Sequence, residues 1–227
     1  MAERTTHRAT LVSVRRETPS ISTFRLDLGA PLGHEAGQHV KVRLPSVGAR
    51  RSYSVASPPG RARTIDITVE RLAGGRVSGA LHDRTRPGDV IEVDGPRGSF
   101  TWGCRTPALL VGGGTGLVPL VSMLRLARES CQPGLVRLVA SVRTAADLPY
   151  RDEMVGPEVS VVCTRAGSSI QREAGRLRVE DLRDALIPGA TAYVCGPKDF
   201  VAHVVDLLDR LGCPPGAIRT EAFGPTA

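Results

Sequence analysis

A run of glycines interrupted by one threonine, Gly112-Gly113-Gly114-Thr115-Gly116, has the composition of a phosphate-binding turn. It follows a short apolar segment at residues 108–111 and precedes an amphipathic segment at 118–128, so it is expected to join a strand to a helix. Glycines let backbone N–H groups approach a ligand closely, and a helix N-terminus favours negative charge. Leu117 stands where the dinucleotide pattern GxGxxG has its third glycine. The turn predicts a nucleotide site, with a plain tight turn as the alternative.

A second candidate site is Val194-Cys195-Gly196-Pro197, where an expected strand at residues 191–195 ends before an expected helix at 200–211. Open parallel sheets bind ligands outside the carboxyl ends of their strands, so this segment and the glycine-rich turn should face one crevice. A cysteine at the end of an apolar strand can also be a small core residue. The pairing with the glycine-rich turn favours a functional role for Cys195.

The elements around these two motifs alternate between strand and helix, which predicts a parallel sheet covered on both faces. The expected strands are 108–111, 135–142, 159–164, 191–195 and 218–223, and the expected helices are 118–128, 179–186 and 200–211. We place this domain at residues 105–227.

The first part of the chain, residues 1–104, has a different rhythm of short strand-like segments separated by turns rich in glycine and proline. The expected strands are 9–14, 21–28, 39–44, 64–70 and 90–93. Residues 77–84 have apolar side chains at helical spacing and are expected to cap the strands as a short helix. This half therefore predicts a small antiparallel barrel or sandwich.

Composition and charge exclude several classes of protein. With 41% apolar and 23% charged residues, 227 residues suit one large or two small folded domains rather than a disordered tail or a disulfide-stapled miniprotein. The net charge of +7 suggests nucleic acid, a membrane surface or an acidic protein as a partner. Because the arginines are scattered and aromatic residues make up only 4%, no polybasic arm or base-stacking platform is expected, and we predict no nucleic acid partner.

The cysteines and the hydropathy of the chain bear on metals and membranes. The five cysteines include no CxxC pair and no neighbouring histidine at ligand spacing, so no metal site is expected. No segment approaches the ~20 apolar residues of a membrane span, and the N-terminus has no apolar signal segment, so no membrane partner is expected. A cytoplasmic location follows as the expectation.

Three motifs in order, Arg51-Ser52-Tyr53-Ser54, GGGTGxxP and CGP, resemble the ferredoxin-NADP+ reductase superfamily over nearly the whole chain. The resemblance implies an N-terminal antiparallel six-stranded β-barrel that binds FAD, followed by a Rossmann-like parallel-sheet domain that binds NAD(P). It implies that Arg51 pairs with the flavin pyrophosphate, a use that suits a guanidinium group. Tyr53 would lie against the isoalloxazine ring, and Ser54 would donate a hydrogen bond near the flavin N5.

The same resemblance extends to other positions in the first half. Gly75-Arg76-Val77-Ser78 matches the GxxS motif at the start of the capping helix, where backbone N–H groups and Ser78 would bind the pyrophosphate. The segment 95–100 matches the turn that ends the barrel. The remaining FAD contacts implied are Ser52, Thr68, Val69, Gly75, Arg76 and Val77.

In the second half, the resemblance implies that the glycine-rich turn cradles the dinucleotide pyrophosphate, with Thr115 toward the nicotinamide. Cys195 would lie near the nicotinamide C4 and the flavin N5. The chain ends in Glu221-Ala222-Phe223-Gly224-Pro225, which resembles members whose terminal strand carries an acidic and an aromatic residue. Phe223 would then cover the second flavin face. The implied nucleotide-binding positions are Gly113, Gly114, Thr115, Gly116, Cys195, Gly196, Pro197 and Phe223, and the implied catalytic residues are Ser54, Cys195, Glu221 and Phe223.

The strand ends also bear on the choice between NADPH and NADH. Folds that prefer NADH commonly end the second strand with an acidic residue, whereas an arginine accommodates the 2′-phosphate. Here the strand ends in Ser141-Val142-Arg143, no acid follows before Asp147, and Arg165 follows the third strand. We therefore expect NADPH, with Ser141, Arg143 and Arg165 at its 2′-phosphate; NADH remains possible, and Arg143 can alternatively be a solvated surface residue.

The resemblance implies an FAD-dependent NAD(P)H oxidoreductase that passes hydride from NADPH or NADH to the flavin N5. Single electrons then go to a separate redox protein such as a ferredoxin, an oxygenase component or a P450 component. No CxxxxCxxC run is present, so no fused plant-type ferredoxin module is expected, and we expect a monomer. The alternatives are a reductase that uses free flavin as a substrate and a flavin-bearing electron-transfer subunit of a larger complex.

Overall fold

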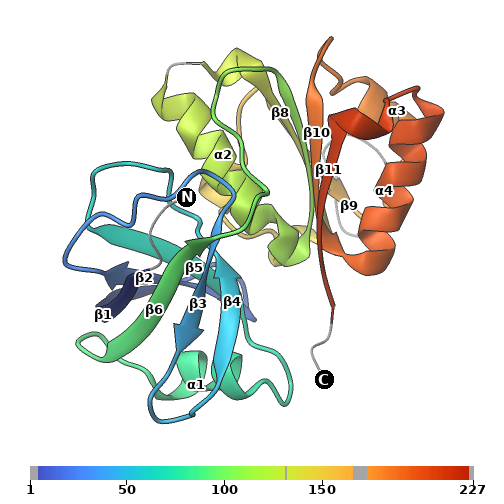
Figure 1. Ribbon diagram of the computed structural model, residues 1–227. Helices are drawn as coiled ribbons and strands as arrows, with labels where there is room; N and C mark the ends of the chain where they lie inside the picture. Colours follow the sequence, from blue (N-terminus) through green and yellow to red (C-terminus); the bar gives the residue numbers. More distant parts are fainter. Residues whose placement is uncertain (1–4, 131, 166–172, 225–227) are drawn as a thin grey trace.

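The computed structural model describes residues 5–130, 132–165 and 173–224, so that Cys131 and Pro225 lie outside the described chain (Figure 1). A half built of strands and one short helix packs against a half in which strands alternate with helices. The boundary expected at residues 104 and 105 lies in the segment between the last strand of the first half and the first strand of the second.

The first half is a six-stranded antiparallel sheet in the order β4-β3-β6-β1-β2-β5. A bridge between Val55 and Ile67 joins the end of β4 to β5, the other edge strand, and so closes the sheet toward a barrel. The expected six-stranded antiparallel domain is confirmed. Its elements are β1 Thr5–Arg16, β2 Ile21–Asp27, β3 His39–Arg43, β4 Arg50–Ser54, β5 Thr64–Glu70, α1 Arg76–Arg84 and β6 Val90–Arg97.

Two strands of the barrel are longer than their apolar patterns predicted. β1 starts at Thr5 and β6 runs to Arg97, because Thr5 and Thr6 pair with Gly95 and Asp94 through backbone hydrogen bonds that do not depend on apolar side chains. β4 differs from its neighbours because its residues are exposed or half-buried. It therefore presents an open surface on one edge of the sheet.

The second half is a five-stranded parallel sheet in the order β11-β10-β7-β8-β9, as expected for a Rossmann-like domain. The central strand β7 is buried throughout, because α2 covers one face and α3 and α4 cover the other (Figure 1). The strands are β7 Ala108–Gly113, β8 Val136–Val142, β9 Val159–Cys163, β10 Thr191–Pro197 and β11 Ile218–Phe223, and the helices are α2 Leu117–Glu129, α3 Val179–Arg183 and α4 Lys198–Arg210.

The helix expected at residues 179–186 ends at Arg183. Ala185 and Leu186 donate backbone hydrogen bonds three residues back, to Leu182 and Arg183, so the helix tightens before Pro188. Pro188 disfavours helical backbone angles at Ile187, so the chain cannot return to helix before the proline. The pattern of apolar residues alone continued past this point.

Apolar side chains also join the two halves. Ala36, Ala56, Phe100 and Trp102 belong to the same buried cluster as the residues under α2. The rings of Phe100 and Tyr193 meet edge to face with 5.4 Å between centroids. Among the described residues, no helix is long and apolar enough to cross a membrane.

Candidate active site

The glycine-rich turn joins β7 to α2 and packs directly on the end of β10. A Cβ added at Gly116 would lie 2.1 Å from the Cys195 carbonyl oxygen, and one at Gly113 would lie 2.9 Å from the Phe200 ring. The turn and the Cys195-Gly196 segment therefore share one crevice edge, as the strand order predicted. Gly113 and Gly116 are buried by this packing.

Gly114 and Thr115 are the partly exposed members of the turn. Gly114 has a φ of +56° and open space around its Cα, so a ligand can approach its backbone. The N-cap of α2, Gly116, makes no side-chain capping bond, and the first turn carries no acidic residue. The N-terminus of α2 is thus available to an anion.

The flavin-binding residues implied by the sequence lie on the open edge of the barrel. Arg51 and Ser52 are exposed on β4, and the Arg51 guanidinium donates to the Arg50 carbonyl oxygen at 2.9 Å. Tyr53 and Ser54 follow as half-buried residues, and burial raises the pKa of Tyr53 to about 12. The neutral phenol of Tyr53 suits a contact with the isoalloxazine ring. The exposed guanidinium of Arg51 suits a contact with the pyrophosphate.

The GxxS segment opens α1 beside a hollow of about 400 Å³. The hollow is lined by Val47, Gly74, Gly75, Arg76 and Gly79, among others, and the α1 N-terminus has neither a side-chain cap nor an acidic first turn. Free N–H groups, arginine and unhindered glycine backbone fit the pyrophosphate of FAD. Ser78 is buried and accepts a 3.4 Å hydrogen bond from the Leu72 N–H, so its side chain supports the loop before the helix.

Thr68 and Val69, on β5, are buried. The Thr68 hydroxyl is hydrogen-bonded to Thr23 at 2.8 Å and accepts from the Tyr150 hydroxyl at 2.5 Å. The Val69 carbonyl oxygen lies 2.9 Å from His82 Nε2. The Thr68 hydroxyl and the Val69 carbonyl group are therefore engaged by other protein groups, and the expected role of both residues at the flavin remains a prediction. Val77 is likewise buried against the barrel core.

Strand pairing brings the four implied catalytic residues toward one junction. Ser54 lies opposite His39 in the β3–β4 pair, and Nδ1 of His39 is 3.9 Å from Oε1 of Glu221. Glu221 lies opposite Cys195, and Phe223 lies opposite Pro197, in the β10–β11 pair. In Figure 1, β11 extends beyond the parallel sheet to the side of β4, where the two halves meet. Phe223 is 38% exposed, so its ring is available there for a ligand.

Burial controls the charges at this junction. It lowers the pKa of His39, helped by Arg97 and Lys41, and it raises the pKa of Glu221. His39 is consequently neutral near pH 7, and its contact with Glu221 is not an ion pair there. Burial and the nearby Glu221 raise the pKa of Cys195 far above its usual range, so the thiol stays protonated and is not a nucleophile.

The residues expected at the 2′-phosphate lie at the carboxyl ends of β8 and β9. Arg143 and Arg165 are exposed, and the Arg165 N–H donates to the Arg143 carbonyl oxygen at 2.9 Å, so the two side chains start from adjacent backbone. Ser141 is buried just before them. Asp147 accepts from the N–H and the hydroxyl of Thr144, at 3.1 and 2.8 Å, and so caps a short turn.

Comparison with known proteins matches both halves. Residues 8–102 match the oxidoreductase FAD-binding domain, and residues 110–206 match the oxidoreductase NAD-binding domain. The crystal structure of the cytochrome P450 reductase GcoB from Amycolatopsis is 29% identical, with a TM-score of 0.84 over 99% of this chain and 72% of that one. The chain belongs to the ferredoxin-NADP+ reductase superfamily.

Other members of the superfamily resemble this chain at similar levels. Phthalate dioxygenase reductase is 28% identical with a TM-score of 0.81, covering 98% of this chain and 69% of that one. The Bordetella pertussis flavohemoprotein is 34% identical and the reductase component of Rhodococcus jostii propane 2-monooxygenase is 30% identical. This chain aligns over 93% and 95% of its own length but spans only 60% and 63% of theirs. FAD and a pyridine nucleotide are thereby confirmed as its cofactor classes.

Two residues that contact across the halves, His39 and Tyr150, were not among the site residues predicted from the sequence. His39 follows Gly37-Gln38 at the start of a short strand, and nothing local indicates that Ser54 and Glu221 face it. Tyr150 lies in a segment with no expected helix or strand, yet it is 2% exposed and donates to Thr68 across the two halves. Both residues acquire their partners through contacts between distant segments.

Proposed function

We propose that this chain is an FAD-dependent NAD(P)H reductase that delivers single electrons to a separate redox protein. The observation that carries the proposal is the junction where Ser54 of the flavin strand, Glu221 and Cys195 lie together beside the exposed Phe223. A junction between an FAD-binding and an NAD-binding domain is where a nicotinamide and a flavin can meet.

Bound FAD would supply the conversion of a two-electron hydride donor into single electrons: one NAD(P)H is oxidised, two one-electron acceptors are reduced, and one proton is released. The protein contributes alignment and exclusion of water. Arg51 and the α1 N-terminus would hold the flavin pyrophosphate, while Tyr53 and Phe223 would flank the ring. Ser54 would orient the flavin near its reacting atom, and the neutral Cys195 would provide an uncharged contact beside the nicotinamide.

We propose NADPH as the preferred donor. Arg143 and Arg165 are exposed at adjacent strand ends, and Asp147 is engaged in capping Thr144, which supports a site for the 2′-phosphate rather than for ribose hydroxyl groups alone. NADPH should have a kcat/KM about tenfold or more above that of NADH, and Arg143→Glu should abolish the preference. Equal values for the two donors in the wild type would contradict the proposal.

The acceptor is proposed to be an acidic redox protein that docks on the FAD-binding half. Residues 1–104 carry 16 Lys and Arg against 10 Asp and Glu, whereas residues 105–227 carry 14 against 13. The net positive charge is therefore concentrated on the half that would hold the flavin, where it can steer an acidic partner. Association should weaken as salt rises. The cytoplasmic location and the monomeric state stay predictions.

The first test is absorbance spectroscopy of the purified protein under anaerobic conditions. The expected result is a yellow protein with FAD bound stoichiometrically, bleached by NADPH and reoxidised by a one-electron acceptor such as ferricyanide. Loss of flavin on dialysis, with full activity on added FMN, would favour a reductase that uses free flavin. Bound flavin that NADPH and NADH both fail to reduce would favour a non-enzymatic electron-transfer subunit. A colourless protein that binds no flavin would refute the proposal.

A further inference from the structure

Helix α2 begins at the nucleotide-binding turn and also contacts the segment that follows the flavin strand. The Ser122 hydroxyl donates to the Ser57 carbonyl oxygen at 2.8 Å, and Nη1 of Arg125 donates to the Ala56 carbonyl oxygen at 2.9 Å. Ala56 comes two residues after Ser54 and is completely buried. One helix therefore joins the turn that would hold the nicotinamide dinucleotide to the strand that would hold the flavin.

Arg125 has further partners within the NAD-binding half. Its guanidinium makes two hydrogen bonds to the Glu153 carboxylate, at 2.6 and 2.8 Å, and lies 5.2 Å from the centre of the Tyr150 ring. Burial acts to lower the pKa of Arg125, but the bonds to Glu153 outweigh it and raise that pKa, so the charge is retained. With only 15% of its side chain exposed, Arg125 is held in one orientation.

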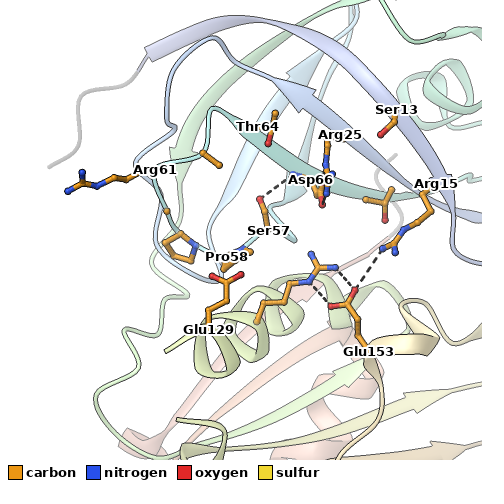
Figure 2. Close-up of a pocket in the computed structure, with 15 residues that line it drawn as sticks. Ser13, Arg15, Arg25, Ser57, Pro58, Arg61, Thr64, Asp66, Glu129 and Glu153 are labelled. Atoms are coloured by element: carbon orange, nitrogen blue, oxygen red, sulfur yellow. Dashed lines mark hydrogen bonds and ion pairs between the residues drawn. The ribbon is translucent and has the colours of Figure 1, made fainter. Parts of the chain in front are cut away.

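The residues that hold Arg125 are themselves anchored to the barrel. Tyr150 donates its hydroxyl proton to Thr68 and its backbone N–H to Glu17, at 2.5 and 3.1 Å. Glu17 also accepts from Thr23 at 2.6 Å. Figure 2 shows Glu153 below and Arg15 and Arg25 above, on opposite sides of a cleft of about 670 Å³ that separates the two halves on this side. Arg15 of β1 reaches toward Glu153 across this cleft, with 3.9 Å between Nη2 and Oε1, so this contact and the hydrogen bonds above link the halves there.

We propose that Arg125 is a positioning residue for hydride transfer. Because it donates hydrogen bonds to both the Ala56 carbonyl group and the Glu153 carboxylate, it sets the distance between the nucleotide-binding turn and the flavin strand. This rests on the proposed function. A displacement of about 1 Å between reacting groups can cost on the order of 100-fold in rate, although each ligand still binds. The proposed role is positioning rather than ligand binding, since the guanidinium is engaged by the Ala56 carbonyl group and the Glu153 carboxylate.

The test compares Arg125→Met with Arg128→Met. Arg128 lies one turn further along α2. Among the described residues its guanidinium donates hydrogen bonds to Glu158, Glu153 and Val155, all in the NAD-binding half, so it is the matched control. For Arg125→Met we expect the anaerobic rate of flavin reduction at saturating NADPH to fall about tenfold or more, with the Kd for NADP+ changed less than about threefold. Arg128→Met should keep the wild-type rate.

Two further variants guard against misfolding. Arg125→Met combined with Glu153→Gln avoids leaving the half-buried Glu153 carboxylate without its main partner, and it should show the same loss of rate as Arg125→Met alone. Arg125→Lys keeps one donor and should recover part of the rate. A wild-type reduction rate in Arg125→Met, or an equal loss in Arg128→Met, would overturn the proposal.

Hydrogen–deuterium exchange of the protein, with and without FAD, provides a readout that does not depend on turnover. Peptides covering residues 55–57 and 117–129 should exchange faster in Arg125→Met than in the wild type, and those covering 55–57 should be unchanged in Arg128→Met. Unchanged exchange at 55–57 in Arg125→Met would overturn the link itself. A wild type that NAD(P)H fails to reduce would instead refute the proposed function and the positioning role together, while the exchange result still decides whether Arg125 links the two halves.

Discussion

The two proposed cofactor regions are built in opposite ways. The nucleotide-binding turn follows a strand buried throughout, and its glycines pack against the Cys195 carbonyl group and the Phe200 ring. The flavin region lies on an edge strand with exposed residues, beside an open hollow and an uncapped helix N-terminus. Gly114 and Thr115 are the partly exposed residues of the turn, whereas Arg51 and Ser52 are exposed.

The difference shows how stability and binding are distributed. In the turn, the atoms that shape the site also pack between β7, β10 and α4, so a change there acts on the fold as well as on the ligand. In the flavin region, the exposed Arg51 guanidinium donates a hydrogen bond to the neighbouring Arg50 carbonyl group, so a change there should act mainly on the ligand. The predictions below measure this contrast.

Gly116→Ala should have the largest effect. Its Cβ would lie 2.1 Å from the Cys195 carbonyl oxygen and 2.5 Å from the carbonyl carbon, and neither backbone atom can move without displacing β10. We expect a loss of roughly 3 kcal/mol or more in the free energy of unfolding, measured by urea denaturation, and loss of NADP+ binding. Gly134→Ala, where the added Cβ meets nothing within 4 Å, is the control and should be near neutral. Equal stability of the two variants would show that the turn is not rigidly packed.

Arg51→Met should separate ligand binding from folding. Loss of a charge-assisted contact to the pyrophosphate, worth about 1.5–3 kcal/mol, should weaken FAD binding by about 10- to 100-fold, measured by fluorescence titration of the apoprotein. The free energy of unfolding without FAD should change by no more than about 0.5 kcal/mol. Arg50→Met, at the adjacent position of the same strand, should leave FAD affinity near the wild-type value. A large loss of stability in Arg51→Met would contradict the contrast between the regions.

Gly75→Ala places the same substitution in the flavin region. The added Cβ would lie 2.2 Å from the Ser78 hydroxyl oxygen, which can rotate away at the loss of its 3.4 Å bond with Leu72. The free energy of unfolding, measured by thermal denaturation, should fall by about 1 kcal/mol, which is well below the loss expected for Gly116→Ala. The double variant with Ser78→Ala should recover most of the loss, and no recovery would mean that the Leu72 backbone, 3.1 Å away, is the true obstacle.

The smallest effect should be a change in the pH dependence of stability in Glu221→Gln. Burial raises the pKa of Glu221, so the stability linked to its protonated form is present at low pH and lost as pH rises through the raised pKa. Because a third of the Glu221 side chain is exposed, the variant should exceed the wild type in free energy of unfolding by less than about 1 kcal/mol at pH 8. This difference should vanish near pH 4.

His39 should produce the opposite slope. Burial lowers its pKa, so stability is lost as pH falls through the ordinary value of about 6.5, where the unfolded chain takes up the proton first. Urea denaturation from pH 5 to pH 8 should therefore show that the free energy of unfolding of His39→Asn falls less toward acid pH than that of the wild type. Parallel curves for this variant and the wild type would place His39 in a solvated environment.

The elements with regular patterns were predictable from the sequence. The fully apolar β7, the amphipathic α2 and the alternation of strands with helices are local properties that follow from the periods of the two structures. The early end of α3 and the extra length of β1 and β6 were not predicted, because they depend on backbone hydrogen bonds rather than on apolar spacing. The 2′-phosphate site remains a prediction.

The sequence alone determined which chemistry is available: glycines where a Cβ has no room, an arginine on the flavin strand, and three motifs in the order of one superfamily. Only the tertiary structure decided which groups meet. His39 and Glu221 come from different domains, and Arg125 lies on an ordinary amphipathic helix until Ala56 and Tyr150 are placed beside it. Such contacts arise from strand pairing and domain packing across distant segments, and no local pattern of residue types encodes them.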